Sequence, residues 1–287
     1  MNNTPLVSIL TALYNHEQYI KEALDSTLKE NYQNKELIII NDGSTDNSEE
    51  VVKTWINDNG HLINVEYYCR PNKGICATAN ELVSKARGKY IVWLPSDDVL
   101  YGDTIGERVT LLERHESSGK LLLVSDAKGI NAKGEIVFNS TMTNYNSGDK
   151  AKYQYENGII EEVLMNPSIS GAVLMINKAI YNIIGMYPTD INAEDWYFMQ
   201  RAAAIKSVLF QDKAVSLYRV HDANTSGGSI PLVQRRRLIV SIIKTYYRNI
   251  RWFKDARHKF LCVFQLIKYI LIYTKISAKI KFLENKN

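Results

Sequence analysis

The sequence predicts an α/β protein: a mixed, mostly parallel sheet with helices on both faces, followed by a helical C-terminal extension. Strand-like and helix-like stretches alternate with short connections over the first part of the chain. Residues 36–41 are almost continuously apolar, as in a strand buried on both faces. Beyond residue 230 the chain is nearly all helix-forming, apolar and basic.

The first strand and helix are predicted from the spacing of apolar residues. Residues 6–11 form a short run rich in strand-forming side chains. Asn15 can cap the helix that follows, with Gln18 at its third position. Over residues 16–32 one helical face carries Ile20, Ala23, Leu24, Thr27 and Leu28.

The same alternation continues through the next elements. Residues 36–41 form the second strand, and Asp46 can cap a helix that carries Val52 and Trp55. The pattern then predicts a third strand at 63–68, a helix at 74–86 and a fourth strand at 89–94.

After Asp98 the pattern is less regular. It predicts helices at 105–116, 177–184 and 194–204, a strand at 121–125 and a polar loop at 139–157. The Gly- and Ser-rich residues 225–229 mark the expected domain boundary. We therefore expect a main domain of residues 1–229 and a basic amphipathic helical extension of residues 230–287.

Composition is ordinary for a globular protein. Of the 287 residues, 45% are apolar and 23% charged, which excludes a disordered, collagen-like or repeat-built chain. Cys69, Cys76 and Cys262 lack metal-ligand spacing and are expected to be reduced thiols. Residues 1–5 are short and polar, so no signal peptide is expected and the protein is placed on the cytoplasmic side.

Charge is divided unevenly along the chain. Residues 231–287 hold 14 Lys or Arg and two acids, a net charge of +12, while the remainder holds 21 basic and 29 acidic residues, a net charge of −8. A basic tail on an acidic body indicates an anionic partner surface, either phospholipid or nucleic acid. No recognised nucleic-acid motif accompanies the charge, so we expect a membrane surface and no nucleic acid.

Polar clusters follow three of the predicted strands. They are Tyr14-Asn15, Asn41-Asp-Gly-Ser-Thr-Asp46 and Ser96-Asp-Asp98. Ligands of open α/β sheets bind at the carboxyl ends of the strands, where these clusters fall. Each cluster alone could be a turn, because Asp-Gly is a common turn dipeptide. Three on one edge favour a binding site.

Asp97 and Asp98 are the most informative pair. Adjacent carboxylates repel each other when they are unpaired. They could begin a helix, where acids are favoured by the helix dipole. They could also hold Mg²⁺ or Mn²⁺, which take one or two carboxylates plus substrate phosphates. Their place at the end of an apolar strand favours the metal site.

Blocks of sequence that contain these clusters run in the order of a known family. The blocks are residues 7–15, 38–48, 72–98, 194–201 and 218–226; they include Asn72-Lys-Gly74, Glu194-Asp-Trp-Tyr-Phe-Met-Gln-Arg201 and Tyr218-Arg-Val-His221. Together they resemble the motifs of the family 2 glycosyltransferases, which have the GT-A fold. The resemblance extends over about residues 6–226, nearly four-fifths of the chain.

The resemblance implies a set of donor-binding residues. Tyr14 would flank or stack on the nucleotide base, Asp42 would accept hydrogen bonds from the base or ribose, and Asp97 would face the ribose. The implied nucleotide-sugar-binding set is Ala12, Tyr14, Asn15, Asp42, Gly43, Ser44, Lys73, Gly74, Asn80 and Asp97. The family often has Pro-Thr where this chain has Ala12-Leu13, and Arg-Asn where it has Ala79-Asn80. The donor-phosphate or packing contact of that Arg is then absent or is supplied by Lys73 or Arg70.

The resemblance also implies the metal and the base. Asp98 would hold Mn²⁺ or Mg²⁺, and His221 would bind the metal or the diphosphate. Asp195 would be the general base, with Glu194 supporting it. Without the resemblance, Asp195 could be a first-turn acid of its helix, and His221 could be a surface or packing histidine.

The function implied is inverting transfer of a sugar from a nucleotide-sugar, with UDP the expected nucleotide. The acceptor would be a hydroxyl of a glycan or a polyprenyl-linked glycan, as in bacterial surface polysaccharide synthesis. A sugar-nucleotide pyrophosphorylase is an alternative, but residues 6–22 contain no glycine for a phosphate-binding loop. A non-catalytic nucleotide-sugar-binding protein is another, which the retained acidic clusters disfavour.

The tail is expected to lie on a membrane. Its longest nearly apolar stretch, residues 260–273, contains Gln265 and Lys268 and looks too short and polar to span a bilayer. A basic amphipathic helix with many aromatic residues instead favours the interface. We therefore expect a cytoplasmic protein associated peripherally with the inner face of the plasma membrane. The alternative is a helical hairpin packed on the main domain.

Overall fold

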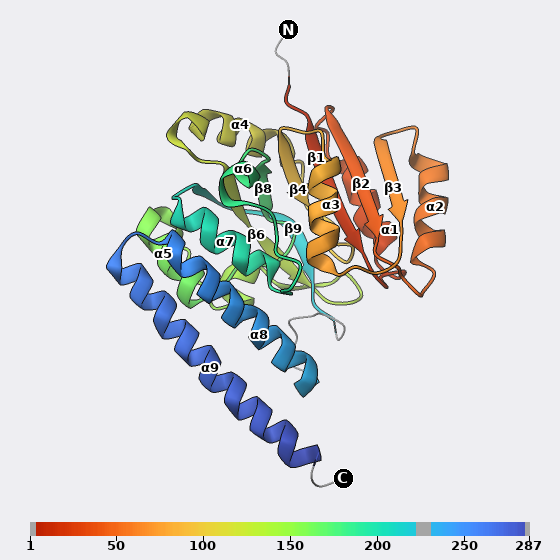
Figure 1. Cartoon of the computed structure of the whole chain (residues 1–287). Helices are drawn as coiled ribbons and strands as arrows, with labels where there is room; N and C mark the ends of the chain where they lie inside the picture. Colours follow the sequence, from red (N-terminus) through yellow and green to blue (C-terminus); the bar gives the residue numbers. More distant parts are fainter. Residues whose placement is uncertain (1–3, 222–230, 285–287) are drawn as a thin grey trace.

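A mixed sheet forms the centre of the protein (Figure 1). The computed structural model describes residues 4–221 and 231–284. Within these residues the strand order is β3-β2-β1-β4-β8-β6-β9-β5, with β7 paired to β6. The strands are β1 (Val7–Leu13), β2 (Lys35–Asn41), β3 (Asn64–Cys69), β4 (Tyr90–Trp93), β5 (Val99–Leu100), β6 (Leu122–Ile130), β7 (Ile136–Phe138), β8 (Leu174–Asn177) and β9 (Val208–Arg219). Strands β1 to β4 are joined in parallel, and β8 runs antiparallel to β4 and β6.

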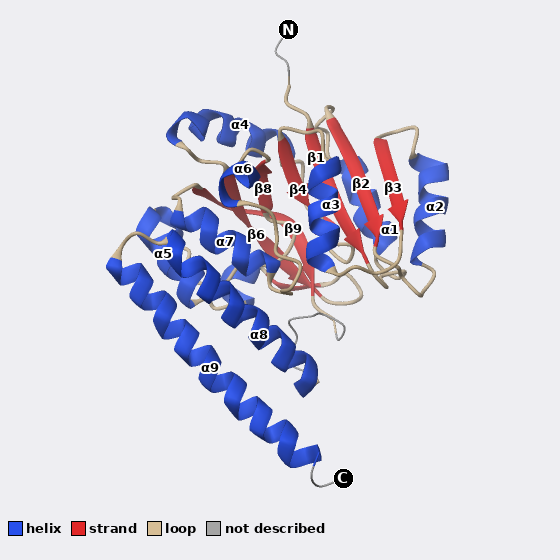
Figure 2. Ribbon diagram, in the orientation of Figure 1, coloured by secondary structure: helices blue, strands red, loops and turns tan. Residues whose placement is uncertain are grey.

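Helices cover both faces of the sheet (Figure 2). The period of two along a strand sends Leu10 and Ile38 into one hydrophobic cluster and Ile9 and Ile39 into the other. The helices are α1 (Ile20–Lys29), α2 (Ser48–Asn59), α3 (Ile75–Lys85), α4 (Ile105–His115), α5 (Glu156–Met165), α6 (Ile180–Ile184), α7 (Glu194–Ala204), α8 (Leu232–Asn249) and α9 (Ala256–Glu284). Residues of α3, α5, α7, α8 and α9 share the first cluster, and residues of α1, α2 and α4 the second. The predicted fold class is confirmed.

The C-terminal extension is a helical hairpin docked on α5 and α7. The Tyr246 hydroxyl donates to the Leu164 carbonyl over 2.5 Å, and Arg257 pairs with Glu161 at 2.9 Å. Trp196 of α7 contacts two rings of the hairpin, with centroids 6.4 Å from Tyr246 and 6.0 Å from Tyr269. The sequence left open, as an alternative, a helical hairpin packed on the main domain. That hairpin is present, and one side of it contacts α5 and α7.

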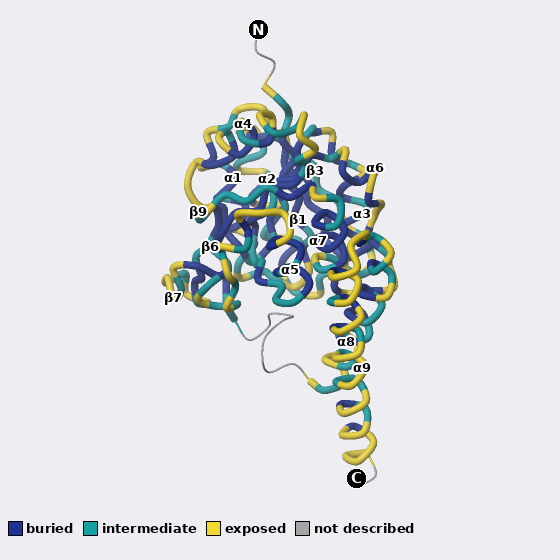
Figure 3. Tube along the Cα trace, turned by 90° about the vertical axis from the view of Figure 1, so that its left-hand side faces the viewer, coloured by how far each residue is buried: buried dark blue, intermediate teal, exposed yellow. Residues whose placement is uncertain are grey.

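Much of α9 is exposed (Figure 3), and its exposed side carries apolar side chains. Large apolar side chains recur there at helical spacing: Phe260, Val263, Phe264, Ile267, Ile270 and Leu271. The helix has 29 residues, about 43 Å at 1.5 Å per residue. By length and composition it could cross a membrane, so the expectation that this segment is too short and too polar is wrong. We call the six side chains the α9 apolar face.

Several elements differ from the sequence-based prediction. The first helix begins at Ile20 and not at His16, and Asn15 does not cap it: its side chain accepts from the Thr45 amide over 2.7 Å. The helix predicted at 177–184 is reduced to α6, because strand β8 ends at Asn177. Strand β9 and helix α5 were not predicted. The helix predicted at 194–204 is confirmed.

Candidate active site

The three polar clusters meet at one edge of the sheet. The parallel register places Leu13 of β1 beside Asn41 of β2, so the chain leaves both strands at the same level. The Asn15 amide donates to the Ser44 hydroxyl over 3.0 Å. The His16 ring nitrogen Nδ1 lies 2.7 Å from the Ser96 hydroxyl. These bonds tie the first cluster to the other two and fix the edge as one surface.

Asp42 organises the loop that leads into α3. Its carboxylate pairs with Arg70 and accepts from the backbone amides of Lys73 at 2.8 Å and Gly74 at 3.0 Å. Its immediate neighbour Gly43 has φ +74°, and a Cβ there would lie 2.7 Å from the Asn72 nitrogen. The resemblance implied that Asp42 would accept hydrogen bonds from the base or ribose, whereas the structure shows its oxygens engaged by the chain itself.

The remaining residues of the expected donor site surround this loop. Tyr14 is half-exposed, Ala12 packs against the core at the end of β1, and Lys73 is exposed. Asn80 lies elsewhere: its side-chain amide donates to the Tyr187 carbonyl over 2.8 Å and accepts from the Tyr187 amide over 2.9 Å. It therefore positions the segment before α7.

His16, Asp97 and His221 form a compact group. Their ligand atoms all lie within 4.8 Å of one another. The His221 Nε2 is 3.1 Å from the Asp97 Oδ2, and the His16 Nε2 is 3.9 Å from the same oxygen. Burial alone would raise the pKa of Asp97, but the hydrogen bond from His221 and the nearby His16 outweigh it and lower that pKa. Sequence reasoning did not single out His16.

Asp98 does not join this group. One oxygen accepts from the Arg219 amide at 2.9 Å, and the other is buried with no hydrogen-bond partner among the described residues. Burial and the adjacent Asp97 charge raise its pKa well above the usual range. A buried carboxylate oxygen without a partner is costly unless a proton or a cation accompanies it. The residues present therefore fit a divalent cation at this edge.

Arg219 connects these elements. Its guanidinium donates to the Asp97 carbonyl at 2.9 Å, pairs with Glu22 and lies 4.8 Å above the Tyr19 ring. It comes from β9, which the sequence reading missed, although Arg219 lies inside the Tyr-Arg-Val-His block. It holds the Asp97–Asp98 turn in place from the neighbouring strand.

Glu194 and Asp195 lie in the first turn of α7. The Asp195 carboxylate accepts from the Trp196 amide at 2.8 Å and keeps contact with solvent. Surrounding protein atoms reduce the hydration of both carboxyls and raise both pKa values, that of Glu194 to about 7 with the Asp195 charge adding to the effect. A raised pKa suits a group that must take up a proton near neutral pH.

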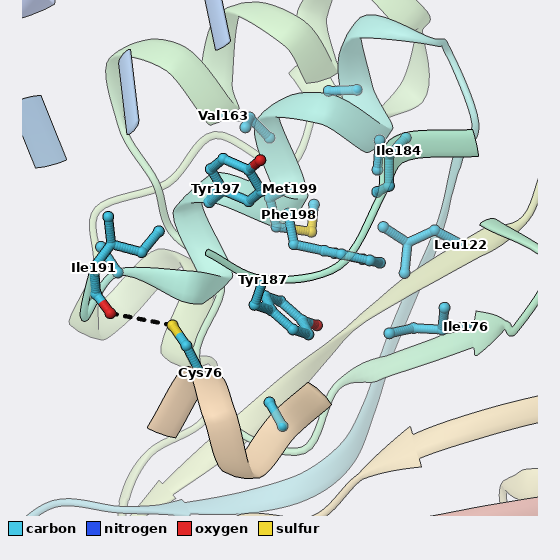
Figure 4. Packing of buried hydrophobic residues seen from close by; sticks show 14 of the residues in the cluster. Cys76, Leu122, Val163, Ile176, Ile184, Tyr187, Ile191, Tyr197, Phe198 and Met199 are labelled. Carbon is cyan, nitrogen blue, oxygen red and sulfur yellow. Dashed lines mark hydrogen bonds between the residues drawn. The ribbon is translucent and has the colours of Figure 1, made fainter. Parts of the chain in front are cut away.

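The segment before α7 is fixed to helix α3. The Cys76 thiol donates to the Ile191 carbonyl over 3.1 Å, in a cluster that includes Tyr187 and Phe198 (Figure 4). Cys76 follows the start of α3, whose preceding Gly74 amide is held by Asp42. The Asp195 helix and the Asp42 loop are therefore anchored to the same element.

Comparison with known proteins agrees with this geometry. The sequence profile of glycosyl transferase family 2 matches residues 8–160. An uncharacterized glycosyltransferase of Rickettsia typhi is 24% identical over 262 residues, which is 90% of this chain and 78% of that protein.

Two solved structures share the fold. S. aureus TarS 1–349 in complex with UDP-GlcNAc has a TM-score of 0.66 at 18% identity and covers 92% of this chain and 72% of its own. The Pyrobaculum calidifontis mannosyltransferase PcManGT, in complex with GDP-Man and Mn²⁺, has a TM-score of 0.65 at 14% identity. The match covers 100% of this chain and 77% of the mannosyltransferase.

Proposed function

The chain belongs to glycosyl transferase family 2 and is a glycosyltransferase, and from that premise we propose the reaction and the roles of its residues. The proposed reaction moves a sugar, with inversion, from a UDP-sugar to a hydroxyl of a glycan or polyprenyl-linked acceptor. Two proteins of the same fold bind nucleotide sugars, UDP-GlcNAc in one and GDP-Man in the other, which supports a donor of this class. A role in surface polysaccharide synthesis belongs to the same proposal.

The donor would bind at the edge where the polar clusters meet. The base would lie against Tyr14 and the loop organised by Asp42, and Lys73 would approach the phosphates from the exposed side of that loop. Because Asp42 already holds its own loop, the backbone that faces the base is fixed before the donor arrives, and less ordering accompanies binding.

A divalent cation would be held by the group of His16, Asp97 and His221, beside which Asp98 would add a second carboxylate. Carboxylate suits Mg²⁺ and Mn²⁺, while the imidazoles in the group favour Mn²⁺ of the two. When bound, such an ion would offset the negative charge that develops on the departing diphosphate. This carboxylate and imidazole group at the sheet edge is the single observation that carries the proposal.

Asp195 would accept the proton of the acceptor hydroxyl as that oxygen attacks the anomeric carbon. The bond to the diphosphate breaks on the opposite side, so one displacement inverts the configuration. Glu194 would stay protonated over part of the neutral range and leave Asp195 as the charged member of the pair. Both carboxyls keep their place because Cys76 and Asn80 fix the segment in front of α7.

The protein would work at a membrane surface. The α9 apolar face is exposed along one side of a basic hairpin, which suits insertion into the headgroup region of an anionic leaflet. The opposite side of α9 is packed from His258 to Ile280, so the helix would lie along the surface while the domain stays docked. The cytoplasmic side of the plasma membrane is the proposed location.

A donor screen tests this function. Purified protein would be titrated calorimetrically with UDP- and GDP-sugars in Mn²⁺, in Mg²⁺ and in excess chelator, and release of the nucleoside diphosphate would be followed. We expect one UDP-sugar to bind and turn over only with metal. Full activity in excess chelator would rule out the metal site, and failure of every nucleotide sugar to bind would rule out the donor class.

A further inference from the structure

A pocket of about 460 Å³ opens beside the start of α7. It lies between the segment before that helix and the two helices of the hairpin. The side chains that line it and matter here are Asp190, Asn192, Arg236, Arg237, Ser241 and Tyr273. None of them has a part in the donor site described above, so the pocket needs its own explanation.

The pocket carries unbalanced positive charge. Its one acid, Asp190, is already paired with Lys244 at 2.9 Å and with both terminal nitrogens of Arg248 at 2.7 and 2.8 Å. Arg236 and Arg237 lie about two turns nearer the start of α8 and have no carboxylate partner in residues 4–221 and 231–284. Two guanidinium groups therefore line the cavity, and no carboxylate of the described residues pairs with them.

Uncharged polar side chains also line the pocket. The side-chain amide of Asn192 and the hydroxyl of Tyr273 make no side-chain hydrogen bond within the described part of the chain. The Ser241 hydroxyl accepts from the Asn192 backbone amide at 3.0 Å and so fixes the segment against α8. Because Asp190 is already paired, the arrangement leaves two guanidinium groups and several uncharged polar groups around the cavity, which suits an anion.

The pocket is close to the proposed base. Asn192 precedes Asp195 by three residues, so their Cα atoms can be no more than about 11 Å apart. The donor diphosphate would have its own site at the sheet edge, where the proposed cation would be held by His16, His221 and Asp97. An anion held beside Asn192 would therefore belong to the acceptor.

We propose that this pocket binds a phosphate or diphosphate group of the acceptor through Arg236 and Arg237. The planar guanidinium fork matches phosphate oxygens and binds them with two parallel hydrogen bonds. A phosphate there would leave the attached sugar within reach of Asp195, and a lipid on that phosphate would extend along the hairpin toward the α9 apolar face. The inference rests on the proposed function and specifies its acceptor class as one that carries a phosphate.

The test uses inorganic pyrophosphate as the probe, with chelator present so that no metal contributes. Its dissociation constant would be measured by calorimetry for the wild-type chain and for Arg236→Gln/Arg237→Gln. The matched control is Arg235→Gln/Lys254→Gln, which removes the same charge from exposed positions outside the pocket. Thermal unfolding of each variant would establish that it is folded.

We expect the pocket variant to bind pyrophosphate at least about tenfold more weakly and the control to bind like the wild type. Equal affinity in the pocket variant, or equal weakening in both, would overturn the proposal. So would Arg236- and Arg237-dependent binding to phosphatidylcholine vesicles with 20% phosphatidylglycerol when pyrophosphate does not bind, because the ligand would then be a lipid headgroup. Pyrophosphate binding without any sugar transfer would count against the proposed function and leave the pocket assignment standing.

Discussion

Replacing Asp42 by Asn should weaken the fold and donor binding together. The carboxylate is buried with Arg70, their side chains being 7% and 12% exposed, and it also holds two backbone amides. Breaking a buried ion pair by removing one charge costs about 3–5 kcal/mol. Because Arg70 keeps its second partner Glu81 at 2.9 Å, we expect the low end, about 3 kcal/mol, and a fall in Tm of roughly 6–12 °C.

The assay is urea unfolding of Asp42→Asn, Arg70→Gln and the double variant, with UDP binding measured in parallel. The double-mutant cycle should give a coupling energy of about 1–3 kcal/mol. Glu81→Gln is the control, because it removes the other partner of Arg70 on a more exposed site, and should cost about 1 kcal/mol or less. UDP affinity should fall as well, because the loop that would face the base loses its anchor. If Asp42→Asn unfolds at the same urea concentration as the wild type, the reasoning is refuted.

Four further outcomes follow from the site. Asp195→Asn should lower turnover by ~10²–10⁴ with near-normal donor binding, and unchanged turnover would identify another base. Since the folded pKa of Glu194 lies at about 7, above the usual 4.5, its contribution to stability is lost as pH rises through that range; Tm profiles of wild type and Glu194→Gln should diverge there. His16→Ala should remove metal-dependent donor binding in calorimetry while the Tm of the protein in chelator stays near that of the wild type. Phe264→Ser/Ile267→Ser should abolish sedimentation with anionic vesicles at low salt; retained binding would show that the α9 apolar face is not the contact.

Local patterns predicted the part of the fold where each strand is a simple apolar run. Strands β1 to β4 and helix α7 lie close to their predicted positions. Strand β9 was missed because Gln211, Asp212 and Lys213 interrupt its apolar pattern, and the ladder with β6 shifts register over this stretch. The pairing of β9 with β6 joins residues that are far apart in the sequence, so the pattern of a short segment does not predict it.

The candidate site likewise contains residues that local sequence patterns predicted and residues that they did not. Asp97 and Asp98 could be found because a pair of acids after an apolar strand is a local signal. His16 could not, because it reaches its partners across 80 residues to Ser96 and through Asp97 to His221, which is 124 residues from Asp97. The engagement of Asp42 by Arg70 likewise depends on the tertiary approach of two loops.

Trp196 connects the first turn of α7 to the C-terminal hairpin. It directly follows Asp195 and packs on Tyr246 of α8 and Tyr269 of α9, whose rings stack 5.9 Å apart. A change in the tilt of the hairpin would therefore move the residue next to Asp195, the proposed base. Among relatives that act on acceptors of different length, substitutions at these three positions should covary, and a chimera that exchanges the hairpin alone should fold with Asp195 displaced unless position 196 is exchanged with it.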